Sequence, residues 1–307
     1  MKLNKTSKVQ HTFWFLLLIS CFINACDPDP KPTPAPGNSD QFETSPQKFE
    51  IKSGMIDEAS GLTESAALKG YLWTMQDSGQ PASLYLLSKD GQSVKQYNIA
   101  GALNHDWEDI ASGPGPAAGI NYLYIADIGN NNLPMTETNV IYRIPEINEI
   151  NGTFNGNQLE KIRFRYPDGP HDAETILLDS TTRDIFIISK ESANTGIYRL
   201  AYPQSVSETI TAEKTGVIPG ATTVTAGDIS LDGSEIMIRT YTNLYYWKRK
   251  KTETITNTLT QAATKQLTVA IEPQGEAICF DRTGNGFYTL SEKGTATSVT
   301  LNFYKRK

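Results

Sequence analysis

Residues 106–111 read DWEDIA, and this short acidic phrase has four relatives elsewhere in the chain. They are EASGL at 58–62, DAETIL at 172–177, GDISL at 227–231 and GEAIC at 275–279. Each phrase leads into a strand-like run, and successive phrases lie about 50 residues apart, with one interval of about 65. This period matches one four-stranded blade of a β-propeller. We therefore expect each phrase to form the innermost strand of a blade and to direct its carboxylates toward one central channel.

The rest of the sequence predicts an all-β domain. Short segments rich in β-branched and aromatic residues alternate with Gly, Asp, Asn and Pro, and no long segment has helical periodicity. The predicted strands, blade by blade, are 55–62, 71–76, 83–88 and 94–99; 107–112, 121–126, 139–144 and 160–166; 172–178, 184–189, 196–201 and 214–218; 226–231, 235–240, 243–249 and 265–271; 275–280, 286–291 and 297–304. The last blade lacks a fourth strand, which the alternating segment 48–52 can supply. This count favours a five-bladed β-propeller closed by an N-terminal strand, with a six-bladed ring as the alternative.

The N-terminus has the features of a secretory signal. Three lysines precede an apolar stretch over 13–25, which is too short to be trusted as a membrane span. The stretch ends in sequences similar to the lipobox of bacterial lipoproteins, so residues 1–26 are interpreted as a signal with lipidation at Cys26. Lipidation at Cys21 is one alternative. A plain signal peptide or an uncleaved anchor, without lipidation, is the other. Residues 27–46 predict a proline-rich disordered tether and 47–307 the propeller. We expect a bacterial cell-envelope protein, held by its lipid on the outer membrane or cell surface.

Composition excludes several function classes. The net charge of −6 is mild, and the basic cluster 248–251 follows a strand, so we predict a solvated turn there and no nucleic-acid binding. Cys279 is the only cysteine in the predicted propeller and lies among apolar residues, which predicts a buried, inert thiol. Nucleophile-elbow, phosphate-loop, HExxH and paired-cysteine metal motifs are absent from the sequence. We expect the protein to be a monomer.

The acidic phrases can be aligned with one another. Matching the turn residues Asp179, Asp232 and Asp281 places Gly227 in register with Glu174 and Glu276, and Asp228 one step later. Glu58 and Ser60 are matched to Asp106 and Glu108. Neighbouring strand residues alternate faces, which weakens the claim of Asp228 to the channel.

This alignment predicts a metal site on the axis, with six candidate ligands: Glu58, Asp106, Glu108, Asp172, Glu174 and Glu276. Carboxylates that share a channel repel one another and lose hydration, so either their pKa values rise or a cation compensates them. Ca²⁺ accepts such oxygen ligands in loose geometry. Zinc and copper would require more imidazole or thiolate than His105 and His171 provide. Backbone capping between blades is the alternative role for any single carboxylate.

The same phrases carry a family resemblance. EASGL, DWEDIA, DAETIL and GEAIC resemble the inner-strand motifs of SdiA-regulated proteins, which are five-bladed propellers distantly similar to NHL-repeat, gluconolactonase and phytase-like propellers. The resemblance covers about 48–307 and implies a calcium site near the axis, with Glu58, Glu108, Glu174 and Glu276 at the matching positions. Gly227 departs from the pattern. NHDWEDIA and YIADIGNN are also similar to segments of a group of bacterial secreted propeller lipoproteins, a resemblance that implies no activity.

A second polar set follows the second strand of each blade, and we expect it to line one cup together with the acidic ring. Its members are Asp77, Asp127 with Asn130 and Asn131, Lys190, Arg239 with Tyr241, and Glu292. The turn in YIADIGNNN, at 124–132, is expected to cap itself through Asx turns, with ion binding as the alternative. Lys190 and Arg239 are candidates to bind a phosphate, carboxylate or sugar acid, or to pair with the ring carboxylates. His105 and His171 each precede a ring aspartate and are candidates for a general base or for hydrogen bonding between blades.

Three functions follow from these features. The leading hypothesis is a lipid-anchored propeller that binds Ca²⁺ in its channel and a small-molecule or glycan ligand in its cup. The second is a metal-dependent hydrolase of an ester, lactone or phosphoester, with catalytic candidates His105, His171, Lys190 and Arg239. The third is a scaffold for protein partners. Fold alone does not choose among them.

Overall fold

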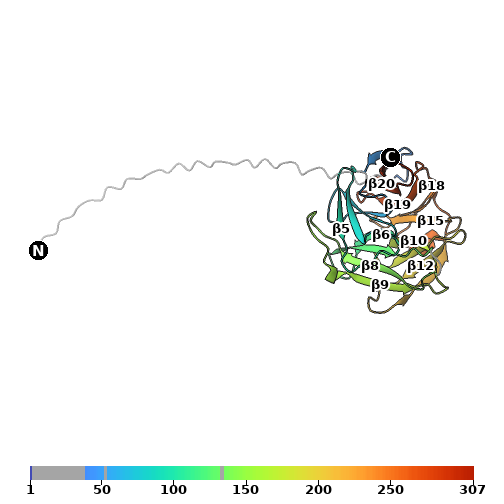
Figure 1. Ribbon diagram of the computed structural model, residues 1–307, viewed down its shortest axis with the longest axis horizontal. Coiled ribbons are helices and arrows are strands. Elements are labelled where there is room, and N and C mark those ends of the chain that lie inside the picture. Colours follow the sequence, from blue (N-terminus) through green and yellow to red (C-terminus); the bar gives the residue numbers. More distant parts are fainter. Residues whose placement is uncertain (2–38, 52–53, 132–134) are drawn as a thin grey trace. The chain divides into compact units, whose positions relative to one another are not determined.

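Five antiparallel sheets stand around one axis and form a five-bladed β-propeller (Figure 1). This computed structural model describes Met1 and residues 39–51, 54–131 and 135–307. The predicted fold class is confirmed, and the six-bladed alternative is wrong. The signal segment, Cys21, Cys26 and most of the predicted tether lie outside the described residues. No helix in the described ranges has the length and apolar character needed to cross a membrane.

Blades 1 to 4 run outward from the axis in chain order, whereas the outermost strand of blade 5 is the N-terminal strand β1. Blade 1 contains β2 (Ala59–Glu64), β3 (Tyr71–Gln76), β4 (Ser83–Ser88) and β5 (Val94–Asn98). Blade 2 contains β6 (Trp107–Pro114), β7 (Asn121–Asp127), β8 (Asn139–Pro145) and β9 (Glu160–Arg165), with β13 (Ile210–Thr211) parallel to β9 at its edge. Blade 3 contains β10 (Ala173–Leu178), β11 (Ile185–Ser189), β12 (Gly196–Leu200) and β14 (Glu213–Val217). Blade 4 contains β15 (Val224–Ile229), β16 (Glu235–Thr240), β17 (Leu244–Lys248) and β18 (Lys265–Leu267), with the short helix α1 (Ile255–Leu259) before β18. Blade 5 contains β19 (Gln274–Phe280), β20 (Gly286–Glu292), β21 (Thr300–Lys305) and β1 (Gln47–Glu50).

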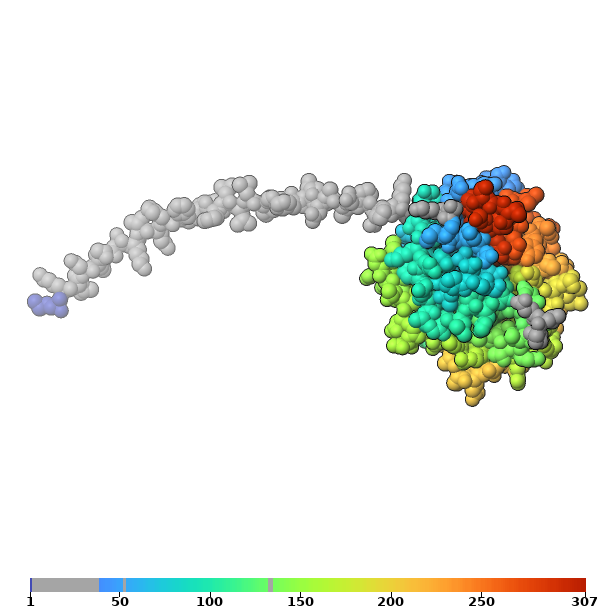
Figure 2. Space-filling view, in the orientation of Figure 1, coloured from blue at the N-terminus to red at the C-terminus, as the bar shows by residue number. Residues whose placement is uncertain are grey.

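The two ends of the propeller meet in blade 5. Strand β1 pairs antiparallel with β21, with Gln47 opposite Phe303, which confirms the predicted closure of the ring. Figure 2 shows the blue N-terminal segment beside the red C-terminal strand. Phe42, from the range assigned to the tether, is buried and lies 5.1 Å from the ring centroid of Phe287. The packed part of the chain therefore begins before residue 47.

All five innermost strands carry a β-bulge at the same place. In each pairing with the second strand, one residue of the inner strand is extra: Gly61, Glu108, Glu174, Thr225 and Glu276. An extra residue re-aims the side chain at that point of the strand. The structure thus defines the ring by its bulges, and three of the five bulge positions hold glutamates.

The bulges correct two parts of the sequence alignment. Thr225, not Gly227, occupies the position of Glu174 and Glu276, because Ser230 rather than Asp232 is the equivalent of Asp179. The backbone amide of Ser230 donates to Glu235, just as Asp179 donates to Asp184 at the end of blade 3. In blade 4 the turn aspartate, Asp232, therefore lies two residues after the position that Asp179 occupies in blade 3. Likewise, Glu58 aligns with His105 rather than with Asp106, since Gly61 is the bulge residue of blade 1.

Hydrophobic clusters fill the spaces within and between neighbouring blades. Trp73 and Trp107 are fully buried between blades 1 and 2, in the same cluster as Tyr97. Cys279 is buried in the cluster shared by blades 1 and 5, and burial raises the pKa of its thiol. An apolar environment of this kind keeps the thiol protonated and inert, as the sequence predicted.

Gly61 has no room for a side chain, and we expect Gly61→Ala to lower the free energy of unfolding by about 1–3 kcal/mol. Its φ is +71°, and an added Cβ would lie 2.8 Å from the Cα of Asp109 in the next blade. Gly79→Ala is the matched control, because Gly79 has a φ of +77° with no atom within 4 Å of an added Cβ. Urea unfolding of both variants separates the cost of a positive φ, which both share, from the cost of the Cβ collision, which only Gly61→Ala has. Equal losses of unfolding free energy in the two variants would contradict the collision.

Candidate metal centre and cup

Three glutamates converge on the axis from different blades. Glu108, Glu174 and Glu276 occupy the bulges of β6, β10 and β19, and each is buried. Desolvation raises the pKa of Glu108 well above its usual value, and the charges of Glu174, Asp77, Asp106 and Glu276 raise it further. Mutual repulsion across the axis shows that these carboxylates share one electrostatic site.

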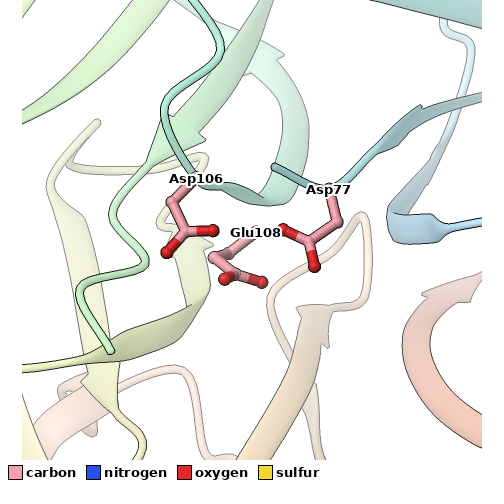
Figure 3. A group of neighbouring side chains, drawn as sticks. All are labelled: Asp77, Asp106 and Glu108. Carbon is pink, nitrogen blue, oxygen red and sulfur yellow. The ribbon is translucent and has the colours of Figure 1, made fainter. Parts of the chain in front are cut away.

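The tightest group contains Asp77, Asp106 and Glu108. One carboxylate oxygen from each lies within 4.8 Å of the others, and Figure 3 shows the three side chains turned toward one another. Asp77 follows β3 of blade 1, whereas Asp106 and Glu108 come from the start of β6 in blade 2. Burial, followed by the charge of Asp77, raises the pKa of Asp106 to about 7. Within the described ranges, none of the three carboxylates pairs with a Lys, Arg or His.

The loop after β7 holds Asp106 in place. The backbone carbonyl of Asp106 accepts from the amides of Ile128 and Gly129 at 3.2 and 3.1 Å. Its own amide donates to Asp127 Oδ1 at 2.8 Å. Gly129 leaves room for these carboxylates, because an added Cβ would displace Glu108 Oε1 and the Asp106 carboxylate. The backbone thus closes one side of the carboxylate group.

Glu174 and Lys190 form an ion pair on another side of the channel. Burial nevertheless raises the pKa of Glu174 to about 8, since it outweighs the effect of Lys190. The second carboxylate oxygen of Glu174, Oε2, is buried and has no hydrogen-bond partner among the described residues. Leaving such an oxygen unsatisfied costs about 1–3 kcal/mol, more when it is charged. The pair therefore leaves one buried acceptor of Glu174 without a donor among the described residues.

The remaining wall of the cup is a chain of polar contacts between blades 3, 4 and 5. Lys190 Nζ donates to the Tyr241 hydroxyl at 3.0 Å, and that hydroxyl donates to Glu276 Oε1 at 3.1 Å. Burial and the neighbouring Glu276 raise the pKa of Glu292 to about 9. The expectation that the second polar set meets the acidic ring is confirmed for Asp77, Lys190, Tyr241 and Glu292.

Four other candidates are not members of the group of Asp77, Asp106 and Glu108, although the charge of Asp172 acts on Asp106 and raises its pKa. Glu58 accepts from Gln80 at 2.6 Å, and Asp172 accepts from the backbone amide of Asn130 at 2.8 Å. Arg239 is buried and pairs with Glu272, so it does not open onto the cup. His171 contacts Glu191 Oε1 at 2.8 Å and Asp168 Oδ1 at 3.0 Å, away from the three-carboxylate group.

His105 is exposed and lines a cavity beside Asp106. Asn130 closes its own loop, because its side chain accepts from the backbone amide of Thr136 at 2.7 Å and donates to the Thr136 carbonyl at 2.9 Å. Asn130 thus caps the loop through Thr136, six residues further on and outside 124–132, rather than through the predicted Asx turn.

Two buried carboxylates join the blades rather than line the cup. Asp109 accepts from the amides of Ile110 and Ile176, both at 2.8 Å. Asp228 repeats this pattern with Ile229 at 2.8 Å and Phe280 at 2.7 Å. Each carboxylate thus bonds the inner strand of the next blade. Asp109 and Asp228 both follow the bulge of their strand, and each is followed by an isoleucine. This shared Asp-Ile dipeptide is a sequence signal for the contact between blades, and the sequence alignment missed it.

Fold and side chains together define a five-bladed β-propeller with a carboxylate cluster on its axis. No family model matches the sequence, and no curated protein matches it. Similar solved structures include the luciferin-regenerating enzyme, at 12% identity and a TM-score of 0.45, covering 81% of this chain and 78% of that chain. A putative oxidoreductase (glucose dehydrogenase) from Thermus thermophilus has 8% identity and a TM-score of 0.47, covering 84% and 100%. The nidogen/laminin complex has 9% identity and a TM-score of 0.44, covering 77% and 72%. At these values the similarities carry no argument about ligand or activity.

Proposed function

We propose that this protein is a lipid-anchored cell-envelope propeller that binds Ca²⁺ on its axis and a ligand in the surrounding cup. The observation that carries the proposal is the group of Asp77, Asp106 and Glu108, whose oxygens lie within 4.8 Å of one another. Three buried or half-buried carboxylates without a cationic side chain are costly unless protons or a metal ion compensate them. The anchor rests on the sequence around Cys26.

The donor set suits calcium better than zinc. All three carboxylates supply oxygen, and Ca²⁺ takes six to eight oxygens, including water, in flexible geometry. Zinc prefers imidazole and thiolate, yet His105 is exposed and His171 is held by Glu191 and Asp168. Asp77, Asp106 and Glu108 would hold the ion. The buried Glu174 Oε2, which has no partner among the described residues, is a further acceptor in the acidic ring. In this proposal the ligand from blade 1 is Asp77, whereas the sequence alignment named Glu58 as the ligand from that blade.

Calorimetric titration of Ca²⁺ into chelator-treated protein tests the proposal. We expect saturable binding that Glu108→Gln and Asp106→Asn each weaken by at least about tenfold, because each removes one anionic ligand. Glu213→Gln is the matched control, since the Glu213 side chain is 63% exposed at the outer edge of blade 3. Absence of binding heat and of any change in Tm would contradict calcium binding, as would equal binding by all variants.

Hydrolysis of an ester, lactone or phosphoester is the second candidate function. Lys190 favours it, because its ammonium, bonded to Glu174 and Tyr241, is a cation at the acidic ring that can hold developing negative charge. A bound cation would polarise a carbonyl or phosphoryl oxygen of the substrate. Lys190 and Tyr241 would position that substrate. Arg239, which is buried against Glu272, and His171, which contacts Glu191 and Asp168, are not part of this proposal. A substrate panel on the Glu108→Gln protein discriminates: retained turnover would exclude the axial site from catalysis.

A further inference from the structure

A cavity of about 380 Å³ opens in blade 2, directly beside the carboxylate group. It lies between the end of β7 and the start of β8, and Asp106 lines both the cavity and the proposed cation site. Small-molecule sites typically enclose roughly 300–1,000 Å³. The cavity therefore has room for a ligand of monosaccharide size next to the axis.

Two residues that line this cavity each have a buried side-chain atom that lacks a hydrogen-bond partner in the described part of the chain. These atoms are Asp127 Oδ2 and Asn139 Nδ2, in residues that are 6% and 3% exposed. One is an acceptor and the other a donor. Buried polar groups in folded proteins are nearly always satisfied, and each exception costs about 1–3 kcal/mol. A complementary pair of exceptions in residues of one cavity wall suits a ligand that supplies a donor and an acceptor together, once side-chain rotation turns the two atoms toward the cavity.

The charge of the cavity narrows the class of ligand. Asp106 and Asp127 line it, and no Lys or Arg of the described residues does. An anionic ligand would therefore meet repulsion. A simple amine would satisfy Asp127 but would leave the Asn139 donor unpaired. A neutral hydroxyl group both donates and accepts, so adjacent hydroxyls can satisfy the two residues at once.

We propose that this cavity is the recognition subsite of the cup for a neutral polyol of monosaccharide size. One hydroxyl donates to Asp127 Oδ2, and its neighbour accepts from Asn139 Nδ2. Thr136 and Thr138, at the rim, offer further hydroxyl contacts. This inference rests on the proposed function, because Asp106 is shared and a ligand hydroxyl oxygen next to it can complete the calcium shell.

Saturation-transfer NMR and calorimetry with D-galactose and galactitol test the proposal, with Ca²⁺ and with a chelator. Galacturonate and galactosamine are matched probes that add a negative or a positive charge. We expect both neutral probes to bind in the presence of Ca²⁺, and Asp127→Asn and Asn139→Ala each to weaken that binding by about tenfold. Asn121→Ala is the control, because Asn121 lies at the opposite end of the same blade and contacts Ser112.

Thr138→Phe fills the mouth from an exposed position and tests the subsite without disturbing buried atoms. We expect it to abolish polyol binding while calcium binding persists. Absence of binding by both neutral probes at millimolar concentration would overturn the proposal, as would preference for either charged probe or unchanged affinity in all three cavity variants. Calcium binding without polyol binding refutes the subsite alone. Polyol binding without calcium binding refutes the cation site alone.

Discussion

Arg239→Met is expected to lower the free energy of unfolding by about 3–5 kcal/mol, because it leaves a buried carboxylate without its cation. The Arg239 guanidinium pairs with Glu272, and the two side chains are 2% and 6% exposed. Breaking a buried pair costs far more than the pair contributes, since the remaining charge stays desolvated. This is the largest stability effect that we expect from a single substitution.

Hydrogen bonds to neighbouring side chains hold the Glu272 carboxylate in its buried position. Its Oε1 accepts from the Thr289 hydroxyl at 2.6 Å and from Asn302 Nδ2 at 2.5 Å, both in blade 5. Arg239 reaches this network from blade 4 across Gly275, whose added Cβ would collide with the guanidinium. The pair therefore joins the last two blades next to the ring closure.

Guanidinium unfolding of Arg239→Met, Glu272→Met and the double variant measures the effect. We expect the double variant to recover most of the loss, because two apolar side chains replace two charges. Lys250→Met is the matched control: Lys250 pairs with Glu253 at 3.3 Å, but its side chain is 81% exposed. Exposed pairs contribute about 0–1 kcal/mol. A loss of similar size in Arg239→Met and Lys250→Met would contradict the argument.

The fold could be predicted from the sequence because each blade repeats the same local pattern of strand-forming and turn residues. Strand-forming segments, turn residues and the phrase period favoured five blades over six, and the alternating segment near Phe49 explained the closure. The register of the inner strands could not be predicted in the same way. A β-bulge adds one residue without a compositional mark, so the sequence alignment matches Glu58 to Asp106, whereas the bulge at Gly61 matches it to His105.

Burial and pairing also lie beyond a single sequence. Lys190 and Arg239 follow similar strands and carry the same charge, yet one faces the cup while the other is buried against Glu272. The difference depends on which side chains of the next blade meet them in space. Asp228 was correctly separated from the ring by its alternation, but its bond to the Phe280 amide requires the neighbouring blade to be present.

The calcium-free protein is expected to lose stability as the pH rises from about 5 to about 9. Burial and repulsion raise the pKa of Asp106 to about 7, of Glu174 to about 8 and of Glu292 to about 9. In the unfolded chain these carboxyls titrate near pH 4. The folded state therefore binds more protons across this interval, so the free energy of unfolding falls with rising pH. Asp232 and Asp281, whose pKa values are lowered, act only below this window.

Bound Ca²⁺ reverses the trend, because it favours the ionised carboxylates that the folded protein otherwise keeps protonated. Thermal unfolding at about pH 5 and about pH 8.5, with chelator or with Ca²⁺, measures the difference. We expect calcium to raise Tm by on the order of 5 °C or more at the higher pH and by much less at the lower. Glu108→Gln provides an internal check: it removes one repelling charge, so its calcium-free form should be more stable than the unaltered protein at the higher pH, while its calcium response shrinks. If the calcium-free Tm is flat or rises across the interval, the axial carboxylates already have another counter-charge and the cation site is wrong.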